Sequence, residues 1–337
     1  MKIYNLFLLL PLLPIAIGIP FTCNESLGFN ASSPVQDNQQ KQKTCKAVAA
    51  NIIFKSEDGG QTWQDISEGL PEELQGGDFF VNNNGLYLTA GNEMYHSTPN
   101  SKAPFWKKGI FAGEHSSITP GNTGIFAYNS RDGVSQKMAG TSVWSPVFTN
   151  FQNKRVRTVI EIAGGTIFIG TDKGFLKSTN SGMTWKQVQT EGWAMKLVES
   201  NGILLATSQR GIIRSADEGE TWETVISEGG VGIDIARING GFAAITFNTQ
   251  SDTRRVRASY DGGKTWQAID AGLPPSMMIS SIIQVGENFF CGHPNGIYRS
   301  SDKGKTWKLL VPSIEGKVFS LFVSGNVIYA IPRNGGC

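Results

Sequence analysis

The sequence predicts an all-β fold, a β-propeller in which seven four-stranded antiparallel blades close into a ring. Tryptophans recur at a nearly constant period, and each period contains short β-patterned runs separated by glycine-rich turns. Seven of the eight tryptophans follow one another at steps of 37 to 44 residues, at Trp63, Trp106, Trp144, Trp185, Trp222, Trp266 and Trp307. The two ends of this array indicate how the ring closes.

One complete repeat shows the four strands expected in each blade. Residues 156–162 are rich in β-branched side chains and suit an inner strand next to the axis of the ring. A second strand is expected at 166–170, a third at 175–178 and an outer, fourth strand at 184–188. Glycine-rich turns separate these runs, as antiparallel hairpins require.

The repeat array begins and ends with half a blade. Ahead of the first periodic tryptophan there is room only for a third and a fourth strand, near 51–55 and 62–66. After the last one, two strands near 317–323 and 327–331 have no partners of their own. We therefore expect the C-terminal pair to supply the inner strands of the blade that the N-terminal pair begins. This closure leaves no free sheet edge.

Five of the periodic tryptophans end a short motif, Ser-x-Asp/Asn-x-Gly-x-Thr-Trp. Its acidic or amide residue and its tryptophan are Asp58 and Trp63, Asn180 and Trp185, Asp217 and Trp222, Asp261 and Trp266, and Asp302 and Trp307. The Asp or Asn side chain can accept hydrogen bonds from the backbone amides after it, and glycine allows a backbone conformation that other residues resist. The motif resembles the Asp-box, or bacterial neuraminidase repeat, of β-propeller blades. We interpret these residues as structural rather than catalytic.

Enzymes that carry Asp-boxes suggest one functional alternative, a glycoside hydrolase. Sialidases resemble one another in an arginine triad whose first member precedes the first box, but the first arginine here is Arg131, well beyond it. Xyloglucan-cleaving hydrolases hold two catalytic aspartates across a cleft between two propellers, and this chain has room for one. A hydrolase of this fold would therefore need a non-standard site, and the inner strands offer Asp78, Glu161, Glu199 and Asp234.

In size and blade number, residues 46–337 resemble the single-domain photosystem II assembly-factor propellers and their sialidase-like bacterial relatives. Those proteins are binding scaffolds. The resemblance implies a non-enzymatic module that recognises a protein or a glycan at the rim of the channel, with no catalytic residues.

A candidate ligand-binding site surrounds Trp193, the one tryptophan outside the periodic series. Aligning the inner strands places Trp193 at the position of Arg157 in the neighbouring blade, with Arg155 and Lys196 close by. Asp234 begins a further inner strand. An indole beside cations can stack on a sugar ring or anchor a peptide. The alternative is that Trp193 plugs the channel and the arginines are solvated.

A second basic cluster occurs in an extended hairpin at residues 248–257. Arg254, Arg255 and Arg257 follow one another closely there. They form either a contact loop for a partner or a solvated strand edge.

The N-terminal region predicts export. Residues 1–18 combine a lysine with an apolar run that suits a secretory signal peptide and is too short to cross a bilayer comfortably. Residues 19–45 are polar and aperiodic, as in a flexible leader, and residues 46–337 form the propeller. We expect a protein that is secreted, or periplasmic in a bacterium, without a transmembrane segment.

Charge and histidine content argue against several other classes of ligand. The formal net charge of +2 gives no field that would attract nucleic acid. The chain has only three histidines and no Cys or His spacing typical of a metal site, so neither a metal nor another cofactor is expected. We expect a monomer.

Four cysteines allow three disulfide connectivities. Cys45 lies just before the first strand and Cys337 just after the last, so a bridge between them would lock the shared blade. Closing so long a loop contributes on the order of 4–5 kcal/mol in the chain-entropy model. Cys23 and Cys291 then form a second pair or remain free thiols.

Overall fold

The computed structural model describes residues 51–71, 77–82, 84–90, 93–98, 106–109, 117–130, 133–149, 154–190, 192–228 and 230–335. The chain divides into a unit of Met1–Ala47 and a unit of Val48–Cys337, and all described residues belong to the second. The predicted signal peptide and leader, and Cys23, Cys45 and Cys337, lie outside the described residues. Within them, no helix is both long and apolar enough to cross a membrane.

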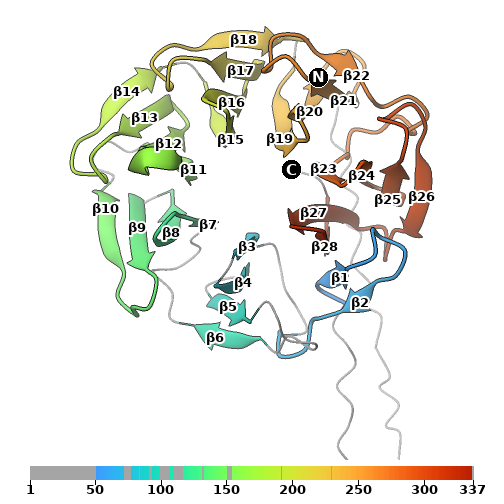
Figure 1. Ribbon diagram of the computed structural model, residues 1–337, viewed down its shortest axis with the longest axis horizontal. Helices are drawn as coiled ribbons and strands as arrows, with labels where there is room; N and C mark the ends of the chain where they lie inside the picture. Colours follow the sequence, from blue (N-terminus) through green and yellow to red (C-terminus); the bar gives the residue numbers. More distant parts are fainter. Residues whose placement is uncertain are drawn as a thin grey trace, which may run out of the picture. The chain divides into compact units, whose positions relative to one another are not determined.

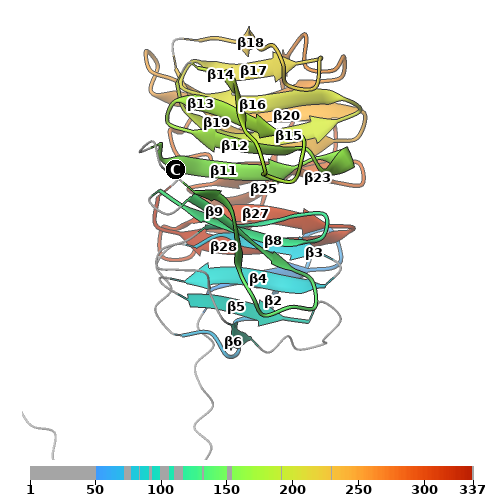
Figure 2. The same ribbon diagram turned by 90° about the vertical axis from the view of Figure 1, so that its left-hand side faces the viewer.

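The second unit is a seven-bladed β-propeller, as predicted (Figure 1). Each blade is a four-stranded antiparallel sheet, and its innermost strand contacts the innermost strands of both neighbouring blades. These contacts run once around the axis and return to the starting blade, so the ring is closed. The side view in Figure 2 shows the sheets stacked edge-on around this ring.

The strands fall into four concentric layers. The inner strands are β3 (Phe79–Asn82), β7 (Ser117–Pro120), β11 (Val156–Glu161), β15 (Ala194–Ser200), β19 (Gly232–Ile238), β23 (Ser281–Val285) and β27 (Val318–Ser324). The second strands are β4 (Gly85–Ala90), β8 (Gly124–Asn129), β12 (Ile167–Thr171), β16 (Ile203–Ser208), β20 (Gly241–Asn248), β24 (Asn288–His293) and β28 (Val327–Arg333). The third strands are β5 (Glu93–Ser97), β9 (Gly133–Met138), β13 (Gly174–Ser178), β17 (Gly211–Ser215), β21 (Thr253–Ser259), β25 (Gly296–Ser300) and β1 (Phe54–Ser56). The outer strands are β6 (Lys107–Gly109), β10 (Ser145–Thr149), β14 (Lys186–Gln189), β18 (Glu223–Ile226), β22 (Gln267–Ala268), β26 (Lys308–Pro312) and β2 (Gln64–Asp65).

The closing blade is shared between the two ends of the chain, as predicted. Its strand order is β2-β1-β28-β27, and Phe54 of β1 lies opposite Ala330 of β28. In the blade β11–β14, the inner, second and third strands lie within one residue of their expected starts. The outer strand β14 begins two residues later than expected, because Thr184 and Trp185 still belong to the box turn.

The hydrophobic core lies between blades rather than in one central mass. Each of the seven blade interfaces of the described chain holds one cluster of buried side chains drawn from both blades. At the interface of blades β11–β14 and β15–β18, for example, the fully buried Phe168 and Phe175 pack with Leu197 and Leu204. Burying one such side chain contributes about 1.5–3 kcal/mol, so stability is distributed around the ring.

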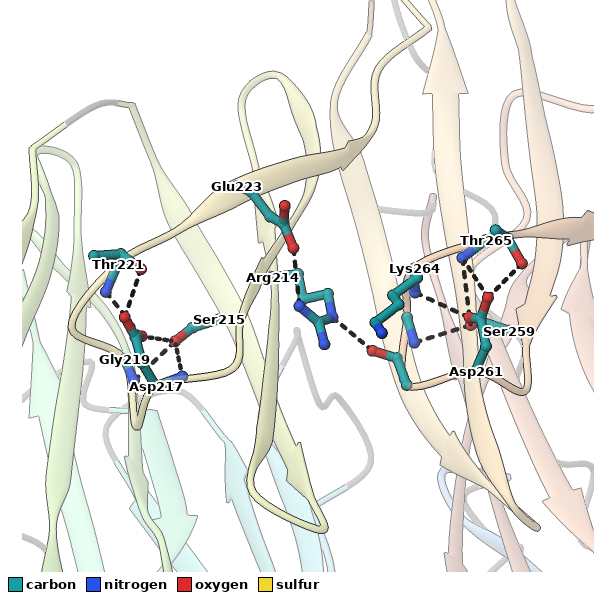
Figure 3. Close-up of polar contacts among 12 residues, drawn as sticks. Arg214, Ser215, Asp217, Gly219, Thr221, Glu223, Ser259, Asp261, Lys264 and Thr265 are labelled. Carbon is teal, nitrogen blue, oxygen red and sulfur yellow. Dashed lines mark hydrogen bonds and ion pairs between the residues drawn. The ribbon is translucent and has the colours of Figure 1, made fainter.

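The four turns of the motif that contain aspartate share one hydrogen-bonding pattern, which Figure 3 shows for two neighbouring copies. In one of them, Ser215 Oγ donates to Asp217 Oδ1 at 2.8 Å, and the amide of Gly219 donates to Ser215 Oγ at 2.9 Å. The Thr221 amide donates to Asp217 Oδ1 at 2.9 Å and its hydroxyl to Oδ2 at 2.5 Å. Arg214 links this region to the next box by donating to the carbonyl of Gly262 at 2.7 Å. These hydrogen bonds close the turn and connect it to the neighbouring blade.

Because neighbouring strands are antiparallel, the loops divide between the two faces of the ring. The inner-to-second turns and the Asp-box turns lie on one face, which we call the box face. The second-to-third turns and the loops that cross from an outer strand to the next inner strand lie on the other, which we call the crossover face. Inner strands therefore start at the crossover face and end at the box face.

Candidate functional site

The candidate residues lie where three neighbouring inner strands begin, at the crossover face. The pairing of β11, β15 and β19 with their second strands is irregular near each start, between Val156 and Thr158, between Ala194 and Leu197, and between Gly232 and Asp234. Such irregularities redirect the side chains beside them. The local backbone therefore determines which residues lie near one another here.

This register corrects the alignment made from the sequence. Val156 lies opposite Thr171 and Ala194 opposite Ser208, the last residues of equivalent second strands. Arg157 therefore corresponds to Met195, and Trp193 corresponds to Arg155. Both strands carry the same one-residue irregularity, so one offset holds along their length, and the alignment made from the sequence was two residues out of register.

Arg157 and Trp193 nevertheless lie together, across the boundary between blades β11–β14 and β15–β18. The guanidinium carbon of Arg157 is 4.9 Å from the centroid of the Trp193 ring. Trp193 is 41% exposed, while the Nε of Arg157 is buried and has no hydrogen-bond partner within the described chain. Trp193 thus forms an exposed surface that a guanidinium supports from one side, which is not what a channel plug requires.

Lys196 and Asp234 form an ion pair between the next two inner strands. Lys196 Nζ lies 2.5 Å from Asp234 Oδ1, and the second carboxylate oxygen, Oδ2, accepts a hydrogen bond from the Ile282 amide at 3.3 Å. The Asp234 side chain is only 9% exposed, whereas that of Lys196 is 47% exposed. Asp234 therefore joins three blades, and both of its oxygens have partners inside the protein.

Other polar side chains join inner strands in the same way. Asp78 Oδ2 accepts a hydrogen bond from the Ile118 amide of the next blade at 3.1 Å, and Ser281 Oγ accepts one from Leu321 at 3.0 Å. A polar residue at or near the start of an inner strand thus connects that strand to the next one. This role accounts for Asp78 without any chemistry.

Arg155 lies just outside β11 and is exposed. Its amide donates to Asp172 Oδ1 at 3.0 Å, and the Asp172 amide donates back to its carbonyl at 3.1 Å. Its backbone is therefore fixed beside Arg157. Met195, at the position equivalent to Arg157, is a second exposed apolar side chain at the start of β15, at 43%. Sequence reasoning missed Met195, because a single methionine at the start of a strand is a common core residue.

The two remaining carboxylates considered for a hydrolase lie at the opposite face. Glu161 and Glu199 sit near the box-face ends of β11 and β15. Glu161 Oε2 accepts a hydrogen bond from the Asn122 amide at 2.7 Å, and Glu199 Oε1 accepts one from Gly202 at 2.9 Å. The candidate carboxylates are thus divided between the two faces and engaged with backbone amides.

The second basic cluster consists of arginines paired inside the protein. Arg254 donates to the Ile279 carbonyl at 2.6 Å, and Arg255 forms two hydrogen bonds with Asp270, at 2.6 and 3.1 Å. Arg257 contacts Glu228 and donates to Thr246 Oγ1 at 2.8 Å. These arginines secure the hairpin β20–β21 rather than forming an unpaired basic surface.

Among the described residues, metal-ligating and nucleophilic side chains form no further site. In the part of the chain that the structure describes, no group of three or more His, Cys, Asp or Glu side chains could hold a metal ion. Cys291 is a free thiol buried in β24, and burial raises the pKa of this thiol far above its usual value. It is a residue of the core between two blades.

Comparison of the sequence with protein-family models and with curated proteins finds no match. Among solved structures, a family GH74 xyloglucanase from Xanthomonas campestris aligns with a TM-score of 0.60 and 14% identity, over 81% of this chain and 53% of that one. The extracellular domain of a putative one-component system from B. thetaiotaomicron aligns with a TM-score of 0.62 and 12% identity, over 79% of this chain and 38% of that one. YCF48 bound to a D1 peptide aligns with a TM-score of 0.55 and 14% identity, over 76% of this chain and 92% of that one.

The chain therefore spans about half the length of the xyloglucanase, and less of the Bacteroides protein. At such low identities the likeness establishes the propeller fold alone. The neighbours include glycoside hydrolases and binding domains, so the fold does not choose between these functions.

Proposed function

We propose that the protein is a secreted, non-enzymatic binding module that holds a carboxylate-bearing ligand at the crossover face. The observation that carries the proposal is the pair of Arg157 and Trp193. Within the described chain, the guanidinium of Arg157 has no hydrogen bond or ion pair, and the indole beside it is exposed. Arg157 is partly exposed, but its Nε is buried without an acceptor among the described residues, and a carboxylate that accepts a hydrogen bond from it would relieve that cost.

The chemistry of the pair favours a ligand that is planar or ring-shaped and acidic. Arginine presents N–H groups in a fork that matches both oxygens of a carboxylate. Contact with the indole fixes the plane of the guanidinium, so less side-chain entropy is lost on binding. The exposed indole then offers a face for a sugar ring or an apolar side chain.

The surrounding residues complete the site. Arg155 adds a second cation whose backbone is fixed by Asp172. Lys196 neutralises Asp234, so the buried carboxylate does not repel an acidic ligand. Together, Arg155, Arg157, Trp193, Lys196 and Asp234 constitute what we call the rim site.

Hydrolysis is the weaker alternative. A two-carboxylate glycosidase needs its carboxyl groups about 5–5.5 Å apart for retention or about 6.5–9.5 Å apart for inversion. Asp234 is committed to Lys196 and to the Ile282 amide, and Glu161 and Glu199 lie toward the other face. Binding without catalysis also has a precedent in the fold, since the neighbour YCF48 is seen with a D1 peptide bound.

A binding experiment with rim-site variants tests the proposal. Arrays of acidic glycans and acidic peptides identify a binder, and its Kd is then measured for the parent and for Trp193→Ala and Arg157→Ala. We expect each substitution to weaken binding ten-fold or more, a loss of about 1.4 kcal/mol. Tyr260→Ala is the matched control, because Tyr260 is similarly exposed but lies by an Asp-box on the other face.

Two results would overturn the proposal. One is that folded Trp193→Ala and Arg157→Ala variants bind every array ligand as the parent does. The other is robust turnover of fluorogenic glycosides that is abolished by Asp234→Asn or Glu161→Gln, which would identify a hydrolase.

A further inference from the structure

A groove lies beside the rim site, between blades β11–β14 and β15–β18. Its volume is about 330 Å³, within the range of sites that hold small molecules. It is lined by the end of β14, by the turn between β16 and β17, and by Ile213, Trp222 and Thr224 of the next sheet. The end of β14 and the β16–β17 turn belong to the crossover face, so the groove reaches the face that carries Trp193.

The groove and the rim site are neighbours in the chain as well. Thr190 and Gly192 line the groove, and Trp193 follows directly. Three peptide units separate Thr190 from Trp193, so their Cα atoms are at most about 11 Å apart. One ligand of modest length can therefore occupy both places.

The wall between the two places is firmly packed. The Gly192 carbonyl accepts a hydrogen bond from the Gly174 amide at 2.9 Å. Gly192 has a φ of +72°, and a Cβ there would lie 3.3 Å from Cβ of Gln209. This glycine lets the loop pass close against the β16–β17 turn, so the groove is part of the folded scaffold.

The lining of the groove suits hydroxyl-rich rings. Trp222 stacks on Phe175 at 5.0 Å, and its indole nitrogen donates to the Gly219 carbonyl at 3.1 Å, so its ring is held in place. Around it lie two amide side chains, two threonine hydroxyls and one guanidinium, from Gln189, Gln209, Thr190, Thr224 and Arg210. Aromatic rings with surrounding amides and hydroxyls bind the apolar and hydroxyl faces of a sugar. The lining residues that the structure describes include no carboxylate that would repel an acidic ligand.

We infer that the ligand of the rim site is an acidic oligosaccharide, with its acidic sugar on Arg157 and Trp193 and neutral sugars in the groove between the two blades. This inference rests on the proposed function and adds a ligand class and a second subsite. Among the lining residues that the structure describes, Arg210 alone is charged, so a peptide would use the rim site but gain little from the groove.

The test uses defined probes and calorimetry on the propeller. The probes are glucuronate, a trisaccharide of two neutral hexoses ending in glucuronate, the matching neutral trisaccharide, and an acidic tripeptide. We expect the acidic trisaccharide to bind at least ten-fold more tightly than glucuronate, and both to lose binding in Trp193→Ala.

Groove variants separate the two subsites. Gln209→Ala and Arg210→Ala should lower the affinity for the acidic trisaccharide to that for glucuronate and leave glucuronate binding unchanged. Lys173→Ala is the matched control, because Lys173 holds the position of Arg210 in the preceding blade and does not line the groove. It should bind all probes as the parent does.

The outcomes distinguish the groove from the rim site. If Trp193→Ala abolishes binding but the groove variants bind the trisaccharide normally, the inference is wrong and the proposed function stands. Binding of the acidic tripeptide alone would also refute the inference and leave the proposed function intact. If no probe or array ligand depends on Trp193, both fail. Equal binding of the neutral and acidic trisaccharides would remove the role given to Arg157.

Discussion

The carboxylates of the Asp-box turns are the most strongly perturbed acids on the surface. Hydrogen bonds from the hydroxyl and amide of Thr62 lower the pKa of Asp58 to about 2, and those from Thr306 lower that of Asp302 to about 2. The pKa values of Asp217 and Asp261 are lowered by the equivalent threonines. In the remaining box, Asn180 Oδ1 accepts a hydrogen bond from the Thr184 amide at 2.9 Å, and Asn180 Nδ2 donates one to the Thr184 hydroxyl at 2.9 Å. An amide thus performs the same structural task without titrating.

We therefore predict that Asp302→Asn folds normally at pH 7 and flattens the acid sensitivity of the protein. Because the folded pKa of Asp302 lies below the unfolded value, the unfolded state binds more protons as the pH falls. The stabilisation is complete above about pH 4 and is lost as the pH falls towards 2. Urea midpoints at pH 7, 4, 3 and 2 should decline less steeply in the variant than in the parent.

An exposed turn aspartate outside the boxes provides the control for this experiment. Asp252→Asn, in the β20–β21 turn, should leave the acid slope unchanged. If Asp302→Asn keeps the full slope of the parent, the hydrogen bonds of the box do not control acid stability.

Among the secondary-structure elements, the box turns act as joints between blades. The motif glycine of each of the five boxes lies against the preceding blade in the ring. A Cβ on these glycines would meet the following side chains: Phe290 at Gly60, Val147 at Gly182, Phe168 at Gly219, Leu205 at Gly263 and Ile269 at Gly304. The motif therefore places a glycine, which has no side chain, where a core side chain of the preceding blade must fit.

We predict that Gly219→Ala is much more destabilising than Gly202→Ala. Both glycines have positive φ, +83° and +77°, so alanine carries a conformational cost of about 1–2 kcal/mol at either site. At Gly202 a Cβ meets nothing within 4 Å, but at Gly219 it would lie 2.6 Å from the buried Phe168 ring. Overpacking adds about 1–3 kcal/mol. Equal urea midpoints for the two folded variants would show that the box does not bear on the neighbouring blade.

The period of the tryptophans and the box motif predicted the blade number and the shared closing blade, because each reflects local turn chemistry and strand length. The rim site was predicted less completely. Arg157 and Trp193 do meet, but the position equivalent to Arg157 in the next blade is Met195, and the residue pattern does not fix the strand register to within two residues. The partners of Arg255 and Arg257 come from separate segments, Asp270 and Glu228, and could not be identified from the clustering of the arginines in the sequence. The groove next to Trp193 depends on how two blades pack and was not foreseen.

At the scale of the whole molecule, the ring depends on one noncovalent joint between the chain ends. Strand β1 pairs with β28 over three residues, Phe54 to Ser56 against Ala330 to Ile328. Core clusters lie on both sides of this blade, so opening it exposes two interfaces at once. The closing blade is therefore where a covalent link would contribute most to stability.

We predict a disulfide between Cys45 and Cys337, which flank β1 and β28 in the sequence and lie outside the described residues. A bond there closes a loop that contains the entire propeller, and its removal should cost on the order of 4–5 kcal/mol of unfolding free energy. Non-reducing peptide mapping should find the two cysteines in one linked peptide, and Cys337→Ser should lower the urea midpoint. A reductant should lower the midpoint of the parent to the same extent and leave the variant unchanged, since Cys291 is already a buried free thiol. Recovery of Cys45 and Cys337 as free thiols, or of either joined to Cys23, would contradict a covalently closed ring.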